Sequence, residues 1–224
     1  MTRRALVSGG SSGIGLALSE RLLERGYRLF WVSLDEAEIN SAREALRKRF
    51  PEAVIEGRAM DLADPQSVPR LVQWVQGEGG IDLLVNNAGF GVYGPSRDLP
   101  VEAEQAMMDV NMRALHAMTR AFLPALEAEG GGVIVNVASN SAFVPTPGLA
   151  VYAATKAFVR HYSRALSQEL KGADSPVRVM TVCPSAVSDT PFKDRAAMDG
   201  VRTFSSFTAT TAAEVAADIM KGHD

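Results

Sequence analysis

Short apolar runs alternate regularly with longer amphipathic runs along the chain, and this alternation most constrains the fold. Strand-like runs lie at residues 4–8, 27–33, 53–59, 81–86, 132–138 and 177–183, and helix-like runs lie at 14–25, 36–49, 65–76, 101–128, 151–171 and 211–221. Apolar strands that alternate with helices predict a parallel sheet covered on both faces. Right-handed crossovers make such a sheet doubly wound. We therefore expect an α/β fold with six parallel strands.

The length and composition are those of one ordinary domain. A chain of 224 residues with 46% hydrophobic residues is long enough for one substantial core, so we expect residues 1–224 to form a single domain. The net charge of −3 indicates no basic face, and we expect neither a nucleic-acid partner nor a membrane partner. Cys183 is the only cysteine and the histidines are scattered, which predicts a reducing cytoplasm and no metal site.

A glycine-rich turn follows the first predicted strand. Gly9, Gly13 and Gly15 stand where this strand meets the first helix, so the amide groups of the helix N-terminus are available to a phosphate. The small residues between them leave room for a pyrophosphate, and the hydroxyls of Ser11 and Ser12 can donate to it. The alternative is a plain tight turn before a helix. The position of the glycines favours a phosphate site.

Tyr152 and Lys156 lie four residues apart on a predicted helix, so they share one helix face. A phenol is a weak acid with a pKa of about 10, and a neighbouring ammonium lowers that pKa. Such a tyrosine can give a proton to a carbonyl or take one from an alcohol. Ser139 ends a predicted strand thirteen residues earlier and can donate to the same oxygen. The alternative is a half-buried ring beside a solvated amine.

Taken together, these segments resemble the short-chain dehydrogenase/reductase family. The matching pieces follow the family's order over nearly the whole length: SGGSSGIG (8–15), Asp61-Leu62, NNAG (86–89), Asn111, Ser139 in VNVAS, and Tyr152-x-x-x-Lys156. The resemblance implies a Rossmann-like, NAD(P)-dependent oxidoreductase. Such an enzyme transfers a hydride between nicotinamide and a carbonyl or secondary alcohol.

The resemblance also implies roles for individual residues. Tyr152 is the general acid/base, and Ser139 holds the substrate oxygen with it; Ser141 is a rival for that role. Lys156 binds the nicotinamide ribose and tunes Tyr152, while Asn111 holds a water that links Lys156 to solvent. The cofactor-binding residues implied are Gly9, Ser11, Ser12, Gly13, Ile14, Gly15, Ser33, Leu34, Asp61, Leu62, Asn87, Ala88, Gly89, Tyr152, Lys156, Pro184, Ser185, Val187 and Thr190.

The identity of the nicotinamide depends on the end of the second strand. Family members that prefer NAD often carry an acid at the place of Ser33, and those that prefer NADP often carry arginine at the place of Leu34. This chain has neither. Ser33 tolerates a 2′-phosphate, whereas Asp35 would repel one if it faced inward. The cofactor is NADP or NAD, and this balance leans to NADP.

The substrate is expected to be a small or medium apolar carbonyl or alcohol. The candidate pocket walls are mostly apolar: Phe90, Val92, Tyr93, Ser141, Phe143, Val144 and Phe192. Residues 185–210 form the candidate substrate lid, which includes Phe204 and Phe207; the alternative for these two rings is ordinary packing. The helices at 101–128 and 151–171 are the family's usual dimer surfaces, so we expect a homodimer or homotetramer.

Two departures from the family pattern keep other functions open. Pro184-Ser185 stands where Pro-Gly is usual, and the run to Thr190 is one residue longer. Relatives usually continue beyond the equivalent of Asp224, so we expect either a compact member or a trimmed chain, with a sheet edge that a partner subunit could cover. The alternatives are a catalytically silent nicotinamide-binding sensor or scaffold and an epimerase or dehydratase. The complete Tyr-Lys set disfavours the first, and the short length disfavours the second.

Overall fold

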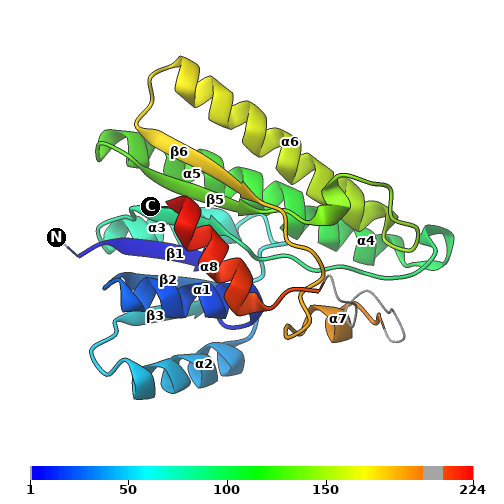
Figure 1. Cartoon of the computed structure of the whole chain (residues 1–224), viewed down its shortest axis with the longest axis horizontal. Coiled ribbons are helices and arrows are strands. Elements are labelled where there is room, and N and C mark those ends of the chain that lie inside the picture. Colours follow the sequence, from blue (N-terminus) through cyan, green and yellow to red (C-terminus); the bar gives the residue numbers. More distant parts are fainter. Residues whose placement is uncertain (1, 199–208, 224) are drawn as a thin grey trace.

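A computed structural model describes residues 2–198 and 209–223 (Figure 1). Six parallel strands form one sheet in the order β3-β2-β1-β4-β5-β6. They are β1 (Arg4–Ser8), β2 (Arg28–Ser33), β3 (Ile55–Ala59), β4 (Leu83–Asn86), β5 (Gly132–Val137) and β6 (Val177–Val182). The order runs outward from β1 in both directions, so the predicted doubly wound α/β sheet is confirmed.

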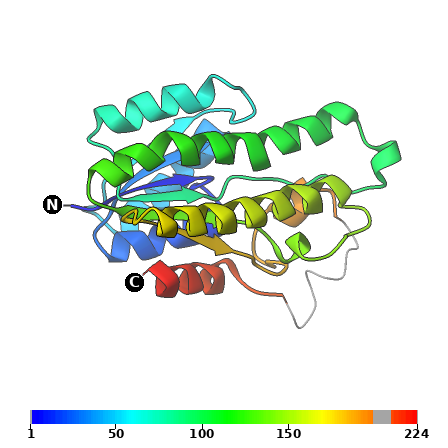
Figure 2. The same cartoon turned by 90° about the horizontal axis from the view of Figure 1, so that it is seen from above.

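Helices cover both faces of the sheet, as Figure 2 shows from above. One face carries α1 (Gly13–Glu24), α2 (Glu36–Arg49) and α8 (Ala212–His223), and the other carries α3 (Ser67–Gly77), α5 (Leu115–Ala128) and α6 (Ala150–Gly172). Two shorter helices, α4 (Val101–Met108) and α7 (Phe192–Arg195), lie near the carboxyl edge of the sheet. In the two described ranges, no helix has the length and apolar character needed to cross a membrane.

The predicted helix at 101–128 is wrong in one respect, because it is not a continuous α-helix. A π-helical segment, η2 (Asp109–Ala114), separates α4 from α5. A π-turn contains one more residue per hydrogen-bonded ring than an α-turn, and it often occurs at functional sites. Asn111 lies in this segment, and its side chain bonds to groups outside the helix. All other predicted strand and helix ends agree with the structure to within two residues.

The core follows from the period of two along the strands. Ala5 and Val7 of β1 face α1 and α8, whereas Leu6 between them faces α3 and α5. The side chains of Leu18 and Leu22 are fully buried on the α1 side. Burying one such leucine stabilises the fold by about 1.5–3 kcal/mol. Because the four central strands β2, β1, β4 and β5 are buried on both faces, the sheet lies between two helical layers.

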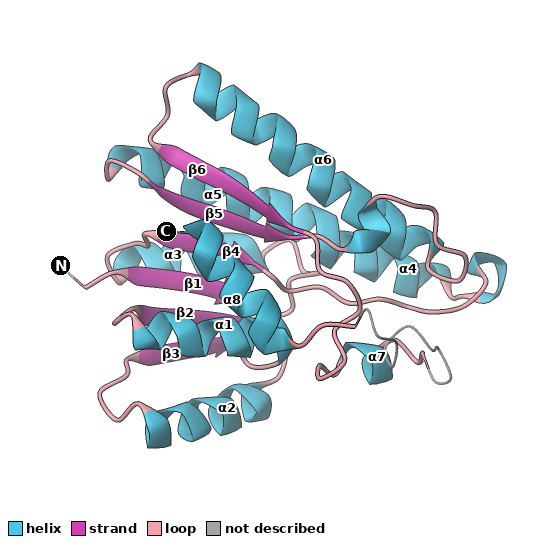
Figure 3. Ribbon diagram, in the orientation of Figure 1, coloured by secondary structure: helices cyan, strands magenta, loops and turns pink. Residues whose placement is uncertain are grey.

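A buried chain of amides fixes α6 against the middle of the sheet. Asn86 of β4 donates to the Asn136 Oδ1 of β5 at 2.8 Å, and Asn136 donates in turn to the Ser163 Oγ of α6 at 2.8 Å. Asn86 also donates to Thr119 Oγ1 at 3.0 Å. Buried polar groups are costly unless they are paired, so these bonds select one register of α6. This register determines which residues of α6 reach the carboxyl edge of the strands (Figure 3).

Candidate active site

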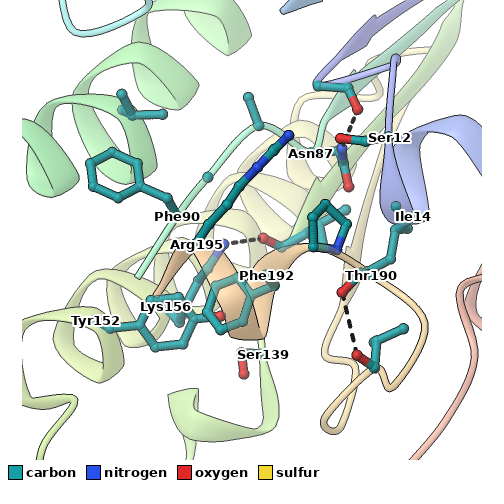
Figure 4. A pocket seen from close by; sticks show the side chains of 18 of the residues that line it. Ser12, Ile14, Asn87, Phe90, Ser139, Tyr152, Lys156, Thr190, Phe192 and Arg195 are labelled. Carbon is teal, nitrogen blue, oxygen red and sulfur yellow. Dashed lines mark hydrogen bonds between the residues drawn. The ribbon is translucent and has the colours of Figure 1, made fainter. Parts of the chain in front are cut away.

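A cavity of about 940 Å³ opens at the carboxyl edge of the strands. Loops that follow all six strands line it, together with α6 and α7 (Figure 4). This is where a doubly wound sheet binds ligands, and the volume suits a molecule of dinucleotide size. Every cofactor-binding residue implied by the sequence lines the cavity, with the exception of Gly15.

The glycine-rich turn has the backbone that a phosphate site requires. Gly9 and Gly13 adopt φ angles of +67° and +52°, which side chains other than glycine rarely adopt. Gly15 plays a different part from the one expected, because a Cβ there would lie 2.0 Å from the Gly9 carbonyl oxygen. Gly15 therefore allows α1 to pack against the turn and does not face the cavity. Asn87 ties the turn to β4 by donating to the carbonyls of Ser8 and Gly9 at 2.9 and 3.2 Å.

The N-terminus of α1 faces the cavity without a side-chain cap. Ser12 is the N-cap residue, and its hydroxyl makes no capping bond to the helix. The first amides of a helix carry a partial positive charge and need acceptors. Ser12, Gly13 and Ile14 line the cavity at this point. The turn and the helix end therefore fit a pyrophosphate, which supplies such acceptors.

Ser11 is buried and does not point at this helix end. Its Oγ donates to Glu38 Oε1 at 2.8 Å and can accept from the Ser33 hydroxyl at 2.9 Å. The Ser11 hydroxyl thus has partners in β2 and α2, and Ser11 also lines the cavity. Glu38 also pairs with Arg195 of α7, whose Nη2 lies 2.5 Å from Glu38 Oε2.

Sequence reasoning missed both Glu38 and Arg195. The signal for Glu38 was its place three residues after Asp35, the residue that caps α2 by accepting from the amides of Ala37 and Glu38 at 2.7 and 3.0 Å. A residue in the first turn of a helix that starts at the carboxyl edge lies close to that edge. Arg195 carries no comparable signal, because its place depends on the path of the chain after β6.

Tyr152 and Ser139 meet in the wall of the cavity (Figure 4). The Tyr152 side chain comes from the first turn of α6 and is 8% exposed. Burial raises the pKa of Tyr152 to about 12, although a hydrogen bond with Ser139 acts in the opposite direction. Ser139 Oγ accepts from the amide of Ser141 at 3.2 Å, so Ser141 supports Ser139 through its backbone. The geometry thus joins Tyr152 with Ser139, the serine favoured by the sequence.

Lys156 lies one helical turn after Tyr152 and is almost completely buried. Its Nζ donates to the Val137 carbonyl at 3.0 Å and is 5.7 Å from the centroid of the Tyr152 ring. Burial lowers the pKa of Lys156 to about 8, with a smaller opposing effect from Cys183. The expected lowering of the Tyr152 pKa by this amine is not found. Removal of the phenol from water determines its pKa, and the effect in the opposite direction comes from Ser139.

Asn111 does not bond to its own helix. Its Oδ1 accepts from the Phe90 amide at 3.1 Å, and its Nδ2 donates to the Phe90 carbonyl at 2.9 Å and to Thr155 Oγ1 at 3.1 Å. A Cβ on Gly89 would lie 2.9 Å from Asn111 Oδ1 and 3.3 Å from Lys156 Nζ. The glycine therefore keeps space between these two polar groups. Asn111 itself is buried beneath the cavity wall.

The segment after β6 closes the cavity from the side of α1. Thr190 lies against the turn, since a Cβ on Gly13 would meet Thr190 Cγ2 at 3.2 Å. Its Oγ1 donates to the Val187 carbonyl at 3.3 Å. The Pro184 carbonyl accepts from the Asn140 amide at 2.8 Å, which ties this segment to the loop that carries Ser139. Thr190 keeps its predicted place in the cavity, despite the longer run before it.

The apolar wall beside Tyr152 is only partly the one predicted. Phe90, Tyr93, Ser141 and Phe192 line the cavity, and the Phe192 ring lies 5.3 Å from that of Tyr152. The prediction is wrong for Phe143, Val144 and Val92. The first two are exposed because the loop after β5 turns outward, and the Arg160 guanidinium lies over the Phe143 ring.

Leu149 and Met198 take their place in the wall. Of the candidate lid at 185–210, residues 199–208 lie outside the described residues, with Phe204 and Phe207 among them.

Comparisons with known proteins agree with this geometry. A family model for short chain dehydrogenases matches residues 3–199. The 2-(R)-hydroxypropyl-CoM dehydrogenase of Xanthobacter autotrophicus is 34% identical over 195 residues, which cover 85% of this chain and 76% of that protein. The 1-deoxy-11-beta-hydroxypentalenate dehydrogenase of Streptomyces exfoliatus is 37% identical over 199 residues, which cover 85% and 69% respectively.

The fold comparison points the same way. The solved structure of a short-chain dehydrogenase from Sphingobium yanoikuyae in complex with NADPH matches with a TM-score of 0.88 and 29% sequence identity. The match covers 98% of this chain and 84% of that one.

Proposed function

The chain belongs to the short-chain dehydrogenase/reductase family, and we propose that it transfers a hydride between NAD(P) and a carbonyl or secondary alcohol with Tyr152 as the general acid/base. The observation that carries the proposal is the contact of Tyr152 with Ser139 in a cavity that also holds Lys156. A sensor or scaffold has no need of two hydroxyls directed at one point beside a buried amine.

The residues present fit a nicotinamide dinucleotide. The uncapped end of α1 and the turn at Gly9 and Gly13 would hold the pyrophosphate, and Asp61 would accept from the adenine amino group. Lys156 and Thr190 would contact the nicotinamide end. When bound, the nicotinamide supplies or accepts the hydride.

Tyr152 and Ser139 together hold the substrate oxygen and move its proton. Both are hydroxyl donors, and two fixed donors stabilise the charge that develops on a carbonyl oxygen during reduction. A phenol with a pKa of about 12 is almost fully protonated at pH 7. Tyr152 is therefore poised to give its proton to that oxygen. In the reverse direction the same phenol must first lose its proton, which burial opposes.

Lys156 and Asn111 replace the proton that Tyr152 gives away. Lys156 is mostly protonated at pH 7, since its pKa is about 8. Asn111 Oδ1 and Lys156 Nζ both approach Gly89, and the carboxamide oxygen has a second lone pair for a water. Such a water would connect the amine with solvent. The outward bonds of Asn111 support this role, because they hold its carboxamide away from its own helix.

The apolar wall supports a substrate without charged groups. Phe90, Tyr93, Leu149, Phe192 and Met198 lie on the side of the cavity near Tyr152. We propose a small or medium apolar ketone, aldehyde or secondary alcohol as the substrate. The proposal also includes residues 185–210 as a substrate lid, a homodimer or homotetramer formed through α4, α5 and α6, and a cytoplasmic location.

Replacing Tyr152 with phenylalanine tests the proposal directly. The variant should lose kcat by about 10²–10⁴-fold, because general acid catalysis contributes that much. Dinucleotide affinity should change little. Turnover is measured at 340 nm against ketones, aldehydes and secondary alcohols, and dinucleotide binding by calorimetry.

Tyr162→Phe is the matched control for this change. Tyr162 lies on the same helix, and its buried hydroxyl has no hydrogen-bond partner among the described residues. Removing that hydroxyl should therefore leave turnover intact. A Tyr152→Phe variant that keeps substantial activity would refute the proposed role of the phenol.

A further inference from the structure

A cluster of polar side chains lies where β2, α2, the glycine-rich turn and α7 meet. Ser11 connects Ser33 with Glu38 through its hydroxyl, at 2.9 and 2.8 Å. Arg195 reaches Glu38 from α7, and Figure 4 shows its side chain extending across the cavity. The glycine-rich turn and α7, which are both distant from α2 in sequence, thus hold the carboxylate of Glu38 at one place on the cavity wall.

At the β2 end of the cavity, negative side-chain charges outnumber positive ones. Burial acts to raise the pKa of Glu38, but bonds from Ser12 and Ser11 and the pairing with Arg195 outweigh it and leave the pKa below its usual value. Glu38 is therefore ionised near neutral pH. Among the described residues that line the cavity, Arg195 and Lys156 are the only cations, and Lys156 lies beside Tyr152. At the β2 end, Arg195 pairs with Glu38, and a second carboxylate, that of Asp35, also lines the cavity.

We propose that Glu38 determines which dinucleotide the protein accepts: its carboxylate accepts a hydrogen bond from a ribose 2′-hydroxyl and repels a 2′-phosphate. Arg195 is the cation that partly offsets the charge of Glu38. This inference rests on the proposed function, and it makes NAD the preferred cofactor. It thereby replaces the lean to NADP that was based on the absence of an acid at Ser33, because Glu38 brings an acid from α2 to the side of the Ser33 hydroxyl.

The place and the charge of Glu38 both suit this role. In doubly wound folds the pyrophosphate lies at the first helix N-terminus, and the adenosine ribose lies by the end of the second strand. Ser33 is that strand end, and Glu38 is one bridging hydroxyl away from it. A phosphate monoester adds a charge of about −1.5 to −2 near neutral pH. Arg195 alone does not balance this charge against two carboxylates, and Leu34, which is 74% exposed, contributes no cation.

The test is a comparison of NADH and NADPH affinities by calorimetry, without any substrate. The wild-type protein should bind NADH at least about tenfold more tightly than NADPH. Glu38→Gln keeps the side-chain size and removes the charge, so it should shift the affinity ratio by at least about tenfold toward NADPH. Arg195→Met should shift the ratio in the opposite direction, because it leaves Glu38 without its cation. A general loosening of the fold would weaken both dinucleotides and leave the ratio unchanged.

Glu36→Gln is the matched control. Glu36 lies in the same first turn of α2, is exposed and does not line the cavity, so the same loss of charge there should leave the ratio unchanged. Equal affinity for the two dinucleotides, a preference for NADPH, or an equal shift in Glu36→Gln and Glu38→Gln would overturn the inference and leave the proposed function standing. Failure of the wild-type protein to bind either dinucleotide would instead overturn the proposed function.

Discussion

Replacing Lys156 with methionine tests the electrostatics of the site through its effect on stability. Burial lowers the pKa of the Lys156 amine to about 8, whereas the pKa of a solvated lysine is about 10.4. A pKa difference of one unit corresponds to about 1.4 kcal/mol. Burying the charged amine of Lys156 therefore lowers the free energy of unfolding by about 3 kcal/mol at pH 7. Methionine removes this cost at similar volume. It also leaves the Val137 carbonyl unpaired, which costs about 1–3 kcal/mol. The variant should therefore be as stable as the wild type, or more stable, at pH 7.

The pH dependence of the difference is the stronger test. Because the folded pKa is the lower one, the unfolded chain binds more protons than the folded chain between pH 8 and about pH 10.4. Wild-type stability gains from this group as the pH rises through that window, and the gain is lost as the pH falls. Methionine does not titrate, and the other groups cancel in the comparison. The stability advantage of the variant should fall by about 2 kcal/mol between pH 8 and pH 10.

Urea unfolding followed by circular dichroism at pH 7, 8, 9 and 10 measures this difference. Lys171→Met is the matched control, since Lys171 is exposed near the end of the same helix and its ammonium stays solvated in both states. A difference between Lys156→Met and the wild type that does not change with pH would refute the reasoning. It would mean that the amine of Lys156 titrates alike in the folded and unfolded chains.

Two further predictions concern packing and the buried amides. Gly15→Ala should lower the free energy of unfolding by about 1–3 kcal/mol, because its Cβ would meet the Gly9 carbonyl at 2.0 Å. Gly77→Ala is the control, because a Cβ at this end of α3 would enter open space, and it should leave the free energy of unfolding unchanged or slightly raised. Urea unfolding measures both variants, and equal effects would contradict the close packing of Gly15 against the Gly9 carbonyl. Asn136→Ala should cost about 2–3 kcal/mol, because it removes two buried hydrogen bonds. A loss under 1 kcal/mol in the same assay would show that the amide chain does not hold α6.

The strands, most helices and the location of the cavity could be predicted from the sequence. Apolar runs that are buried on both faces can only be central strands, and loops at the carboxyl ends of parallel strands necessarily meet at one edge. Tyr152 and Lys156 share a face by helical geometry alone. These inferences needed only local spacing and the topology of the fold.

The features that the sequence did not predict depend on contacts between distant segments. The π-helical turn accompanies bonds from Asn111 to Phe90 and Thr155, which no local pattern reveals. The carboxylate of Glu38 is held by groups from the glycine-rich turn and α7. The raised pKa of Tyr152 depends on how completely the fold buries the phenol. A sequence shows which charges are present but not how much water surrounds them.

The most direct test of the central claim is a crystal structure of the protein with its preferred dinucleotide, read for the position of the Tyr152 hydroxyl relative to the nicotinamide C4 atom. We expect the hydroxyl and Ser139 Oγ to face C4 with room for one carbonyl group between them. A nicotinamide that lies elsewhere, or a hydroxyl directed away from C4, would contradict the assignment of Tyr152 as the proton donor.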